Sequence, residues 1–214
     1  MQWANWNILF AMMATVAFAS TAVLAIREDK DLDVFGAIVL GLITAVGGGT
    51  IRDLILDVPV FWSLDLNYIW VGVGTSILAF YGRRLFTKRH IYSLMLYLDG
   101  FGAALFGIQA TAKVWDLGFG LPAAPVILGI VTAIGGGLMR DVLAGRTTLL
   151  MKAELYAVPV TIGGIAFVMV LHYLPDYREI GSIICILATF AWRGAAIHWN
   201  LRMPMLARTG GERR

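Results

Sequence analysis

The fold is decided by the stretch Gly41-Leu-Ile-Thr-Ala-Val-Gly-Gly-Gly-Thr-Ile-Arg-Asp53, because it occurs twice. Its second copy is Gly129-Ile-Val-Thr-Ala-Ile-Gly-Gly-Gly-Leu-Met-Arg-Asp141, 88 residues further on, and eight of the thirteen positions are identical. Self-similarity at a fixed offset indicates a chain built from a structural repeat. The same offset pairs Phe18 with Phe106 without a gap. The repeat therefore extends well beyond the glycines.

The composition places the chain in a membrane. Of its 214 residues, 59% are hydrophobic and 14% are charged. Soluble domains have about 45–50% apolar and about 25% charged residues, so part of this apolar surface must face lipid. The same numbers exclude a disordered chain, a coiled coil and a secreted disulfide scaffold. The single cysteine, Cys185, cannot form an internal disulfide.

Seven stretches approach the roughly 20 helical residues that a bilayer core requires. They are residues 4–26, 34–51, 66–82, 91–112, 117–139, 155–174 and 180–199. The sequence therefore predicts an all-α integral membrane protein with seven transmembrane helices in a single membrane domain.

The repeat divides these helices into two groups of three, followed by a seventh helix. We assign repeat one to residues 4–86, repeat two to 91–174, the extra helix to 180–200 and a cytoplasmic tail to 201–214. Three spans are an odd number, so the second copy starts on the opposite side of the membrane. The prediction is two inverted three-helix repeats plus a seventh helix.

The distribution of basic residues predicts the orientation. With seven spans, Arg52, Lys113 and Arg178 lie on one side and the other fourteen Lys and Arg residues on the other. Cytoplasmic loops carry the excess of Lys and Arg, which places the N-terminus outside and the C-terminus in the cytoplasm. We expect a multi-pass protein of the cell (inner) membrane whose first span is an uncleaved helix. The net charge of +3 then requires no nucleic acid partner.

The two glycine triplets predict kinked or locally unwound helices. Glycine lowers helix stability by about 1 kcal/mol relative to alanine. Backbone groups freed inside a membrane are tolerated against protein or a water-filled cavity, where their oxygens would favour a partly dehydrated cation. The alternative is that the glycines only let two helices pack closely. The expected pore-kink positions are Gly47, Gly48, Gly49, Gly135, Gly136 and Gly137.

An Arg-Asp pair follows each triplet, Arg52-Asp53 and Arg140-Asp141. A charge near the membrane boundary is costly unless it is paired, hydrated or extended to the headgroups. We expect these four residues to form a gate or to set the electrostatics of a pathway. The alternatives are that each arginine binds its neighbouring aspartate, reaches the headgroups, or holds a lipid or substrate anion.

Asp99 is the only acid deep within an apolar span, and we expect it to contribute to the same gate or pathway electrostatics. It requires a partner or water, and we favour a partner across the bundle, with Arg140 as the candidate, over a free cation site. Thr44 and Thr132, three residues before each triplet, could line a route with their hydroxyls. The alternative, in which each hydroxyl binds the carbonyl one turn back, is favoured.

No feature of the sequence indicates an enzyme. The loops are too short for a catalytic domain, and no nucleophile lies within sequence reach of a base. The histidines show no ligand spacing, so we expect neither a metal nor a cofactor; they are His90, His172 and His198.

The doubled Gly-Gly-Gly-x-x-Arg-Asp motif, the seventh helix and the run Leu98-Asp-Gly-Phe-Gly-Ala-Ala-Leu-Phe106 resemble prokaryotic members of the trimeric intracellular cation channel family. The resemblance implies a homotrimer in which each protomer has its own pore. From the sequence we expect membrane lipid around it, and no soluble protein partner is evident. The resemblance also implies that kinked second and fifth helices line that pore and that potassium, or sodium, permeates. One departure is that the first repeat has Ala11 where the second has Asp99.

We therefore expect a monovalent cation channel that is permeable to potassium. The main alternative is a secondary transporter for a small amino acid such as glycine, because related prokaryotic sequences have also been described as glycine transporters. A structural membrane subunit is a third alternative. A zwitterion site would need a half-helix N-terminus facing the carboxylate, whereas a cation route would need carbonyl ends and continuous water.

Overall fold

The computed structural model describes residues 2–26, 32–85, 88–151 and 155–201, and within them it is all-helical. The helices are α1 (Gln2–Ala25), α2 (Val34–Ile55), α3 (Phe61–Leu64), α4 (Asn67–Gly82), α5 (Lys88–Asp116), α6 (Ala123–Leu143), α7 (Ala157–Tyr173) and α8 (Arg178–His198). Short 3-10 helices occur at Arg83–Leu85 (η1), Leu149–Met151 (η2) and Pro175–Tyr177 (η3). The predicted tail lies outside the described residues from 202 onward.

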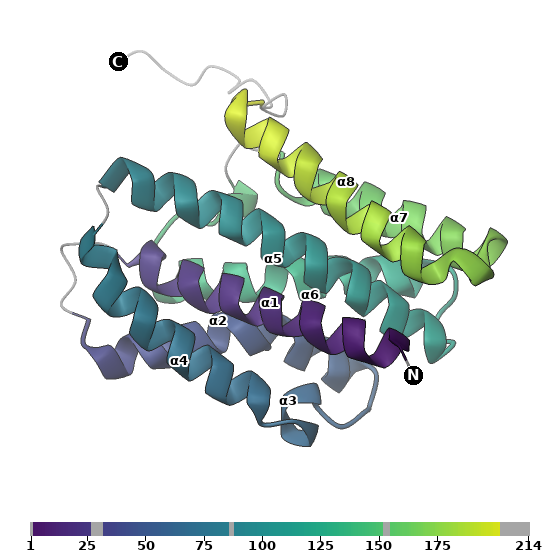
Figure 1. Cartoon of the computed structure of the whole chain (residues 1–214), viewed down its shortest axis with the longest axis horizontal. Helices are drawn as coiled ribbons and strands as arrows, with labels where there is room; N and C mark the ends of the chain where they lie inside the picture. The colour runs from purple at the N-terminus through teal and green to yellow at the C-terminus, as the bar shows by residue number, and fades with distance from the viewer. Residues whose placement is uncertain (1, 27–31, 86–87, 152–154, 202–214) are drawn as a thin grey trace, which may run out of the picture.

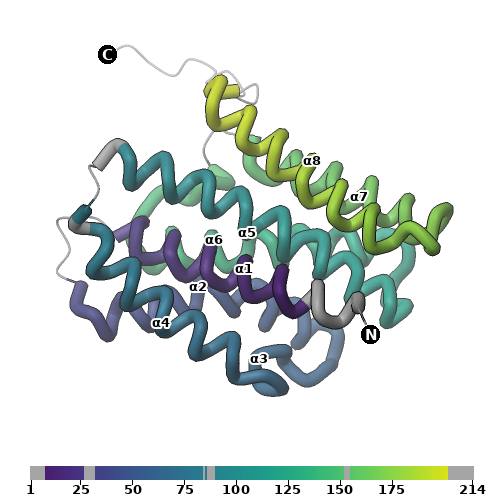
Figure 2. Tube along the Cα trace, in the orientation of Figure 1, coloured from purple at the N-terminus to yellow at the C-terminus, as the bar shows by residue number. Residues whose placement is uncertain are grey.

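Two helices, α1 and α5, form the centre of the bundle and run in opposite directions (Figure 1). α1 contacts α2 and α4, α5 contacts α6 and α7, and α8 packs on α5 and α7 at one side (Figure 2). At the contact between α1 and α5 the rings of Phe18 and Phe106 stack with centroids 5.8 Å apart. These two residues are partners in the sequence repeat.

The 88-residue offset of the sequence also relates the elements of the structure. The four-residue helix α3 starts at Phe61, and its counterpart η2 starts 88 residues later at Leu149. α2 and α6 also end alike: Asp57 follows α2 with φ of 54°, and Gly145 follows α6 with φ of 64°. A residue in this left-handed conformation is a common helix stop, and it favours glycine or a short polar side chain.

Within the part of the chain that the structure describes, five helical segments are long and apolar enough to cross a membrane. They are Ile8–Ala25, Val34–Ile55, His90–Asp116, Ala123–Leu143 and Pro175–His198. α7 is a shorter apolar helix of 17 residues, and α4 has 16, so the count of seven spans stays a prediction. Large apolar side chains face outward, including Leu78, which is 75% exposed, and Phe35, which is 72% exposed. Apolar exposure on this scale identifies a helical membrane protein.

The predicted fifth span, 117–139, is wrong at its start. Residues 117–122 form turns, and the helix begins at Ala123 and continues to Leu143. Gly118 and Gly120 adopt positive φ angles of 64° and 54°, which an α-helix does not accommodate. Residues 117–122 are uncharged, so the search for uncharged stretches included this turn in the predicted span.

The predicted unwinding at the glycine triplets is also wrong, because α2 and α6 are helical without interruption through Gly47–Gly49 and Gly135–Gly137. The two helices instead pack against each other at these residues. A Cβ added at Gly48 would overlap the carbonyl oxygen of Thr132, and one added at Gly136 would overlap that of Thr44. Absence of a side chain therefore permits backbone contact, which is the packing alternative. No unwound segment therefore interrupts either helix at these residues, and the expected kink at the glycines stays a prediction.

Candidate functional site: two arginine centres in the helical bundle

The first centre surrounds Arg52, one turn beyond the glycines of α2. Arg52 Nε donates to Asp53 Oδ1 at 2.8 Å, and Arg52 Nη2 lies 2.8 Å from the same oxygen. The other carboxylate oxygen, Asp53 Oδ2, accepts from the backbone N–H of Phe61 at 2.9 Å. The aspartate therefore holds the arginine and also anchors the chain that returns after α2.

The second centre, around Arg140, repeats this geometry. Arg140 Nε donates to Asp141 Oδ1 at 2.9 Å, and the N–H of Leu149 donates to Asp141 Oδ2 at 3.1 Å. Leu149 is the repeat partner of Phe61. The interpretation that each arginine binds its neighbouring aspartate is confirmed at both centres.

Arg140 has two further partners that Arg52 lacks. Its Nη1 donates to Asp99 Oδ1 on α5 at 2.6 Å and to Thr21 Oγ1 on α1 at 2.9 Å. The side chains of Arg140 and Asp99 are fully buried. The predicted partnership between Asp99 and Arg140 is therefore confirmed. One guanidinium ties α1, α5 and α6 together at this end of the bundle.

The Arg140 centre is closed but not fully hydrogen-bonded. Asp99 Oδ2, Arg140 Nη2 and the Tyr156 hydroxyl are buried without a hydrogen-bond partner among the described residues. All three side chains converge beside Gly137, where an added Cβ would lie 3.0 Å from the Tyr156 hydroxyl. Each unsatisfied buried polar group costs about 1–3 kcal/mol. The ion pairs of Arg140 therefore stabilise this closed arrangement, whereas the three atoms without hydrogen bonds destabilise it.

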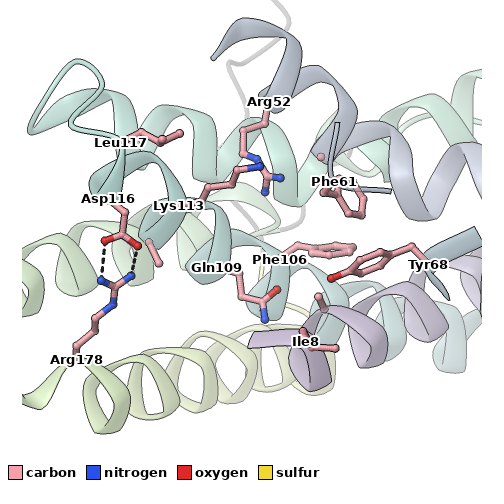
Figure 3. A pocket seen from close by; sticks show the side chains of 13 residues that line it. Ile8, Arg52, Phe61, Tyr68, Phe106, Gln109, Lys113, Asp116, Leu117 and Arg178 are labelled. Atoms are coloured by element: carbon pink, nitrogen blue, oxygen red, sulfur yellow. Dashed lines mark hydrogen bonds and ion pairs between the residues drawn. The ribbon is translucent and has the colours of Figure 1, made fainter. Parts of the chain in front are cut away.

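A cavity of about 350 Å³ opens at the Arg52 end (Figure 3). Arg52 and Lys113 point toward each other in it, and Lys113 Nζ donates to Asp53 Oδ1 at 2.7 Å. Arg178 and Asp116 form a bidentate ion pair with N–O distances of 2.6 and 2.5 Å. The walls between these groups are largely apolar and include Ile8, Ala11, Phe61 and Phe106.

Charge distinguishes the two centres although their backbones repeat. Arg140 meets two carboxylates, Asp99 and Asp141. Arg52 meets one carboxylate and shares it with a second cation, Lys113. The repeat partner of Asp99 is Ala11 and that of Lys113 is Ala25. Among these ion-paired groups, Arg140 with its two carboxylates has one excess negative charge, and Arg52 with Lys113 and Asp53 has one excess positive charge. A further buried cation, Arg193, lies beside the Arg140 centre with its guanidinium 5.2 Å from the centroid of the Tyr156 ring.

Lys113 was missed by the sequence analysis, which counted it as a basic loop residue. The available signal was that the repeat pairs the charged Lys113 with Ala25, as it pairs the charged Asp99 with Ala11. The threonines have the favoured alternative role: Thr44 and Thr132 each donate to the carbonyl four residues back at 2.7 Å. Both are buried beside the contact of α2 and α6, and a role in lining a route stays a prediction.

A family model described as "Glycine transporter" matches residues 8–84 and 96–172. The UPF0126 inner membrane protein YadS of Escherichia coli strain K12 is 37% identical over 198 residues, which cover 92% of this chain and 94% of that protein. A UPF0126 membrane protein of Vibrio cholerae is 35% identical over 206 residues, covering 94% and 83%.

Solved structures extend this similarity. The trimeric intracellular cation (TRIC) channel orthologue from Rhodobacter sphaeroides superposes with a TM-score of 0.85 at 31% identity, covering 92% of this chain and all of that chain. A trimeric intracellular cation channel from C. elegans, at 13% identity and a TM-score of 0.64, shares the fold. With these relatives, the chain is a multi-pass inner membrane protein. It belongs to the family that the glycine transporter model describes, which includes the UPF0126 membrane proteins, and it is a prokaryotic member of the trimeric intracellular cation channel family.

Proposed function

We propose that this protein is a monovalent cation channel, permeable to potassium, with a pore inside each protomer of a homotrimer. Similarity to the channel orthologue from Rhodobacter sphaeroides, across that whole chain, supports the cation channel and the trimer. The pore passes between α2 and α6, the second and fifth predicted spans, and both helices remain continuous through their glycines.

One observation carries the proposal: a cavity reaches Arg52 from one end of the bundle, and the symmetry-related Arg140 is fully buried at the other. Between them, α2 and α6 touch through Gly48 and Gly136. A route along this line has an open vestibule and two barriers, the glycine contact and the Arg140 centre. The arrangement is that of a closed channel.

Opening requires Arg140 to leave its partners. Its guanidinium blocks the route sterically and repels a cation. Once it moves, Asp99 and Asp141 stay behind with carboxylate oxygens, which are ligands suited to a hard cation. The arginine centre is thus a gate whose removal exposes the negative charge that a cation needs. The movement of Arg140 would therefore also remove the positive charge that repels a cation from the closed route.

The distribution of Lys and Arg residues supports one orientation of the protein in the membrane. We place the Arg140 end at the cytoplasm, with the N-terminus outside, since fourteen of the seventeen basic residues fall on that side of a seven-span topology. The vestibule at Arg52 then faces the exterior.

Planar-bilayer recording of the purified protein in potassium salts tests the proposal. We expect discrete unitary currents carried by potassium, and a higher open probability for Asp99→Asn, which removes the charge that holds Arg140. Gly74→Ala is the matched control, because a Cβ at Gly74 meets no atom within 4 Å. Absence of unitary currents from folded protein in potassium salts would refute the channel.

A small-amino-acid transporter is the second candidate. The description of the family model and the excess positive charge at Arg52, which suits a carboxylate, favour it. Uptake of radiolabelled glycine into proteoliposomes distinguishes the two. Saturable uptake together with an absence of unitary currents would establish the transporter, and unitary currents without uptake would exclude it.

A further inference from the structure

We infer that the cavity at the Arg52 end is a binding site for a small monovalent carboxylate, bound by Arg52 and Lys113. The inference concerns a ligand other than the permeating cation, and it does not rest on the proposed function, because binding is measured without transport.

The geometry provides donors from two elements at one place. Arg52 comes from α2 and Lys113 from α5, and both point into the cavity (Figure 3). Arg52 is 6% exposed, so its guanidinium has little contact with bulk solvent. The ion pair with Asp53 and the ring of Phe61, whose centroid lies 5.8 Å from Arg52 Cζ, hold the guanidinium in place. A fixed, planar guanidinium beside an ammonium forms a charged donor set that suits a carboxylate.

The charges leave room for one anion. Asp53 is the acid that both Arg52 and Lys113 contact, and the Arg178–Asp116 pair at the same cavity is neutral as a unit. Asp65 is not among the cavity-lining residues, and its carboxylate accepts from the N–H of Asn67. One positive charge of the Arg52–Lys113 pair therefore has no carboxylate of its own, and the Lys113 side chain is 34% exposed toward the cavity opening. A monovalent anion that enters the cavity would neutralise this charge.

The size and charge of the site select the class of ligand. A dianion such as phosphate would replace the excess positive charge by a negative one. A volume of about 350 Å³ accommodates a small molecule, and the walls at Ile8, Phe61 and Phe106 suit a short apolar stem. The phosphodiester of a lipid is also a monovalent anion, so the experiment separates a lipid from a soluble carboxylate.

Thermal unfolding of the purified full chain in an uncharged detergent, followed by tryptophan fluorescence, tests the inference with sodium acetate as the probe. We expect the unfolding midpoint to rise saturably with acetate, and to rise less with sodium chloride at equal ionic strength. Binding to the folded state raises stability by mass action, which makes the rise a measure of affinity.

Two pairs of variants make the test specific. Ala11→Asp adds a carboxylate to the cavity wall at the repeat position of Asp99, whereas Ala11→Asn has the same size without the charge. Lys113→Met removes one donor, whereas Arg146→Met removes the same charge at the other end, where Arg146 donates to the Ala25 carbonyl at 2.8 Å. We expect Ala11→Asp and Lys113→Met to weaken acetate binding by about tenfold or more. The other two variants should bind acetate as the wild type does.

Three results would overturn the inference. The first is a wild-type midpoint that does not respond to acetate. The second is equal acetate binding by Ala11→Asp and Ala11→Asn. The third is an anionic phospholipid that copurifies with the wild type and not with Lys113→Met, found by mass spectrometry of extracted lipid, together with no response to acetate. That last result would assign the donors to a headgroup.

Discussion

A methyl group added at Gly136 should separate two helices that now touch. Its Cβ would overlap the carbonyl oxygen of Thr44 and lie 3.1 Å from the carbonyl carbon. Gly48 is the mirror case, with its added Cβ 3.1 Å from the carbonyl carbon of Thr132. The obstructing atoms are helix backbone, which cannot rotate away as a side chain can. Relief therefore requires α2 and α6 to move apart.

The size and sign of the effect follow from this contact. Overpacking a well-packed interior costs about 1–3 kcal/mol, and an obstructing backbone places Gly136→Ala near the upper end, at about 3 kcal/mol. Gly74→Ala should have the opposite sign, because nothing lies within 4 Å and alanine favours a helix by about 1 kcal/mol. In the double variant Gly48→Ala/Gly136→Ala the cost should be less than additive, since one separation relieves both overlaps.

Equilibrium unfolding by sodium dodecyl sulfate in mixed micelles, followed by tryptophan fluorescence, measures these differences. The expected order of stability is Gly74→Ala, wild type, then Gly136→Ala. If Gly136→Ala were as stable as Gly74→Ala, the close contact between α2 and α6 would be refuted. If the two single costs added fully in the double variant, the two overlaps would be independent and the single crossing would be refuted.

Three further predictions concern charge. Asp99→Asn should lower the free energy of unfolding by about 3 kcal/mol, because Arg140 stays buried after losing a charged partner, and the same detergent titration measures it. Asp116→Asn should cost about 0–1 kcal/mol, because the Asp116 side chain is 49% exposed in its pair with Arg178; a cost as large as that of Asp99→Asn would contradict this. Ala11→Asp should raise potassium current at low salt about threefold over Ala11→Asn, since one charge at about 7 Å in water changes the local cation concentration by that factor. The difference should vanish at 1 M salt, where screening shortens to about 3 Å, and equal currents at low salt would contradict it.

Much of the helical framework could be predicted from the repeat and from hydropathy, since both depend on local sequence. The error at residues 117–122 has a physical reason. Apolar composition marks what can contact lipid, and it does not report backbone conformation. Gly118 and Gly120, with their positive φ angles, were the available sign that the helix had not yet begun.

The glycine triplets show where sequence reasoning fails. A glycine-rich segment weakens its own helix and also allows another backbone to approach, and the two outcomes require the same residues. Which one occurs depends on a neighbour 88 residues away. By contrast, the partner of Asp99 could be predicted, because a lone buried acid must find a cation and Arg140 was the candidate from the repeat. Prediction succeeded where burial imposed a requirement on one residue.

The Arg52 and Arg140 ends of the bundle have similar backbones but different charged groups, so a charged solute is affected differently at each end. The backbone repeats closely, down to the Phe61 and Leu149 N–H groups that donate to Asp53 and Asp141. Substitutions at repeat positions, Asp99 for Ala11 and Lys113 for Ala25, change the balance of charge in opposite senses at the two ends. Once Arg140 has moved aside, a cation would thus be repelled by Arg52 and Lys113 at the vestibule and attracted by the carboxylates of Asp99 and Asp141 at the other end. An anion bound at the vestibule cancels the first of these effects and leaves the second, so occupancy of that site would control cation access without any change in the gate.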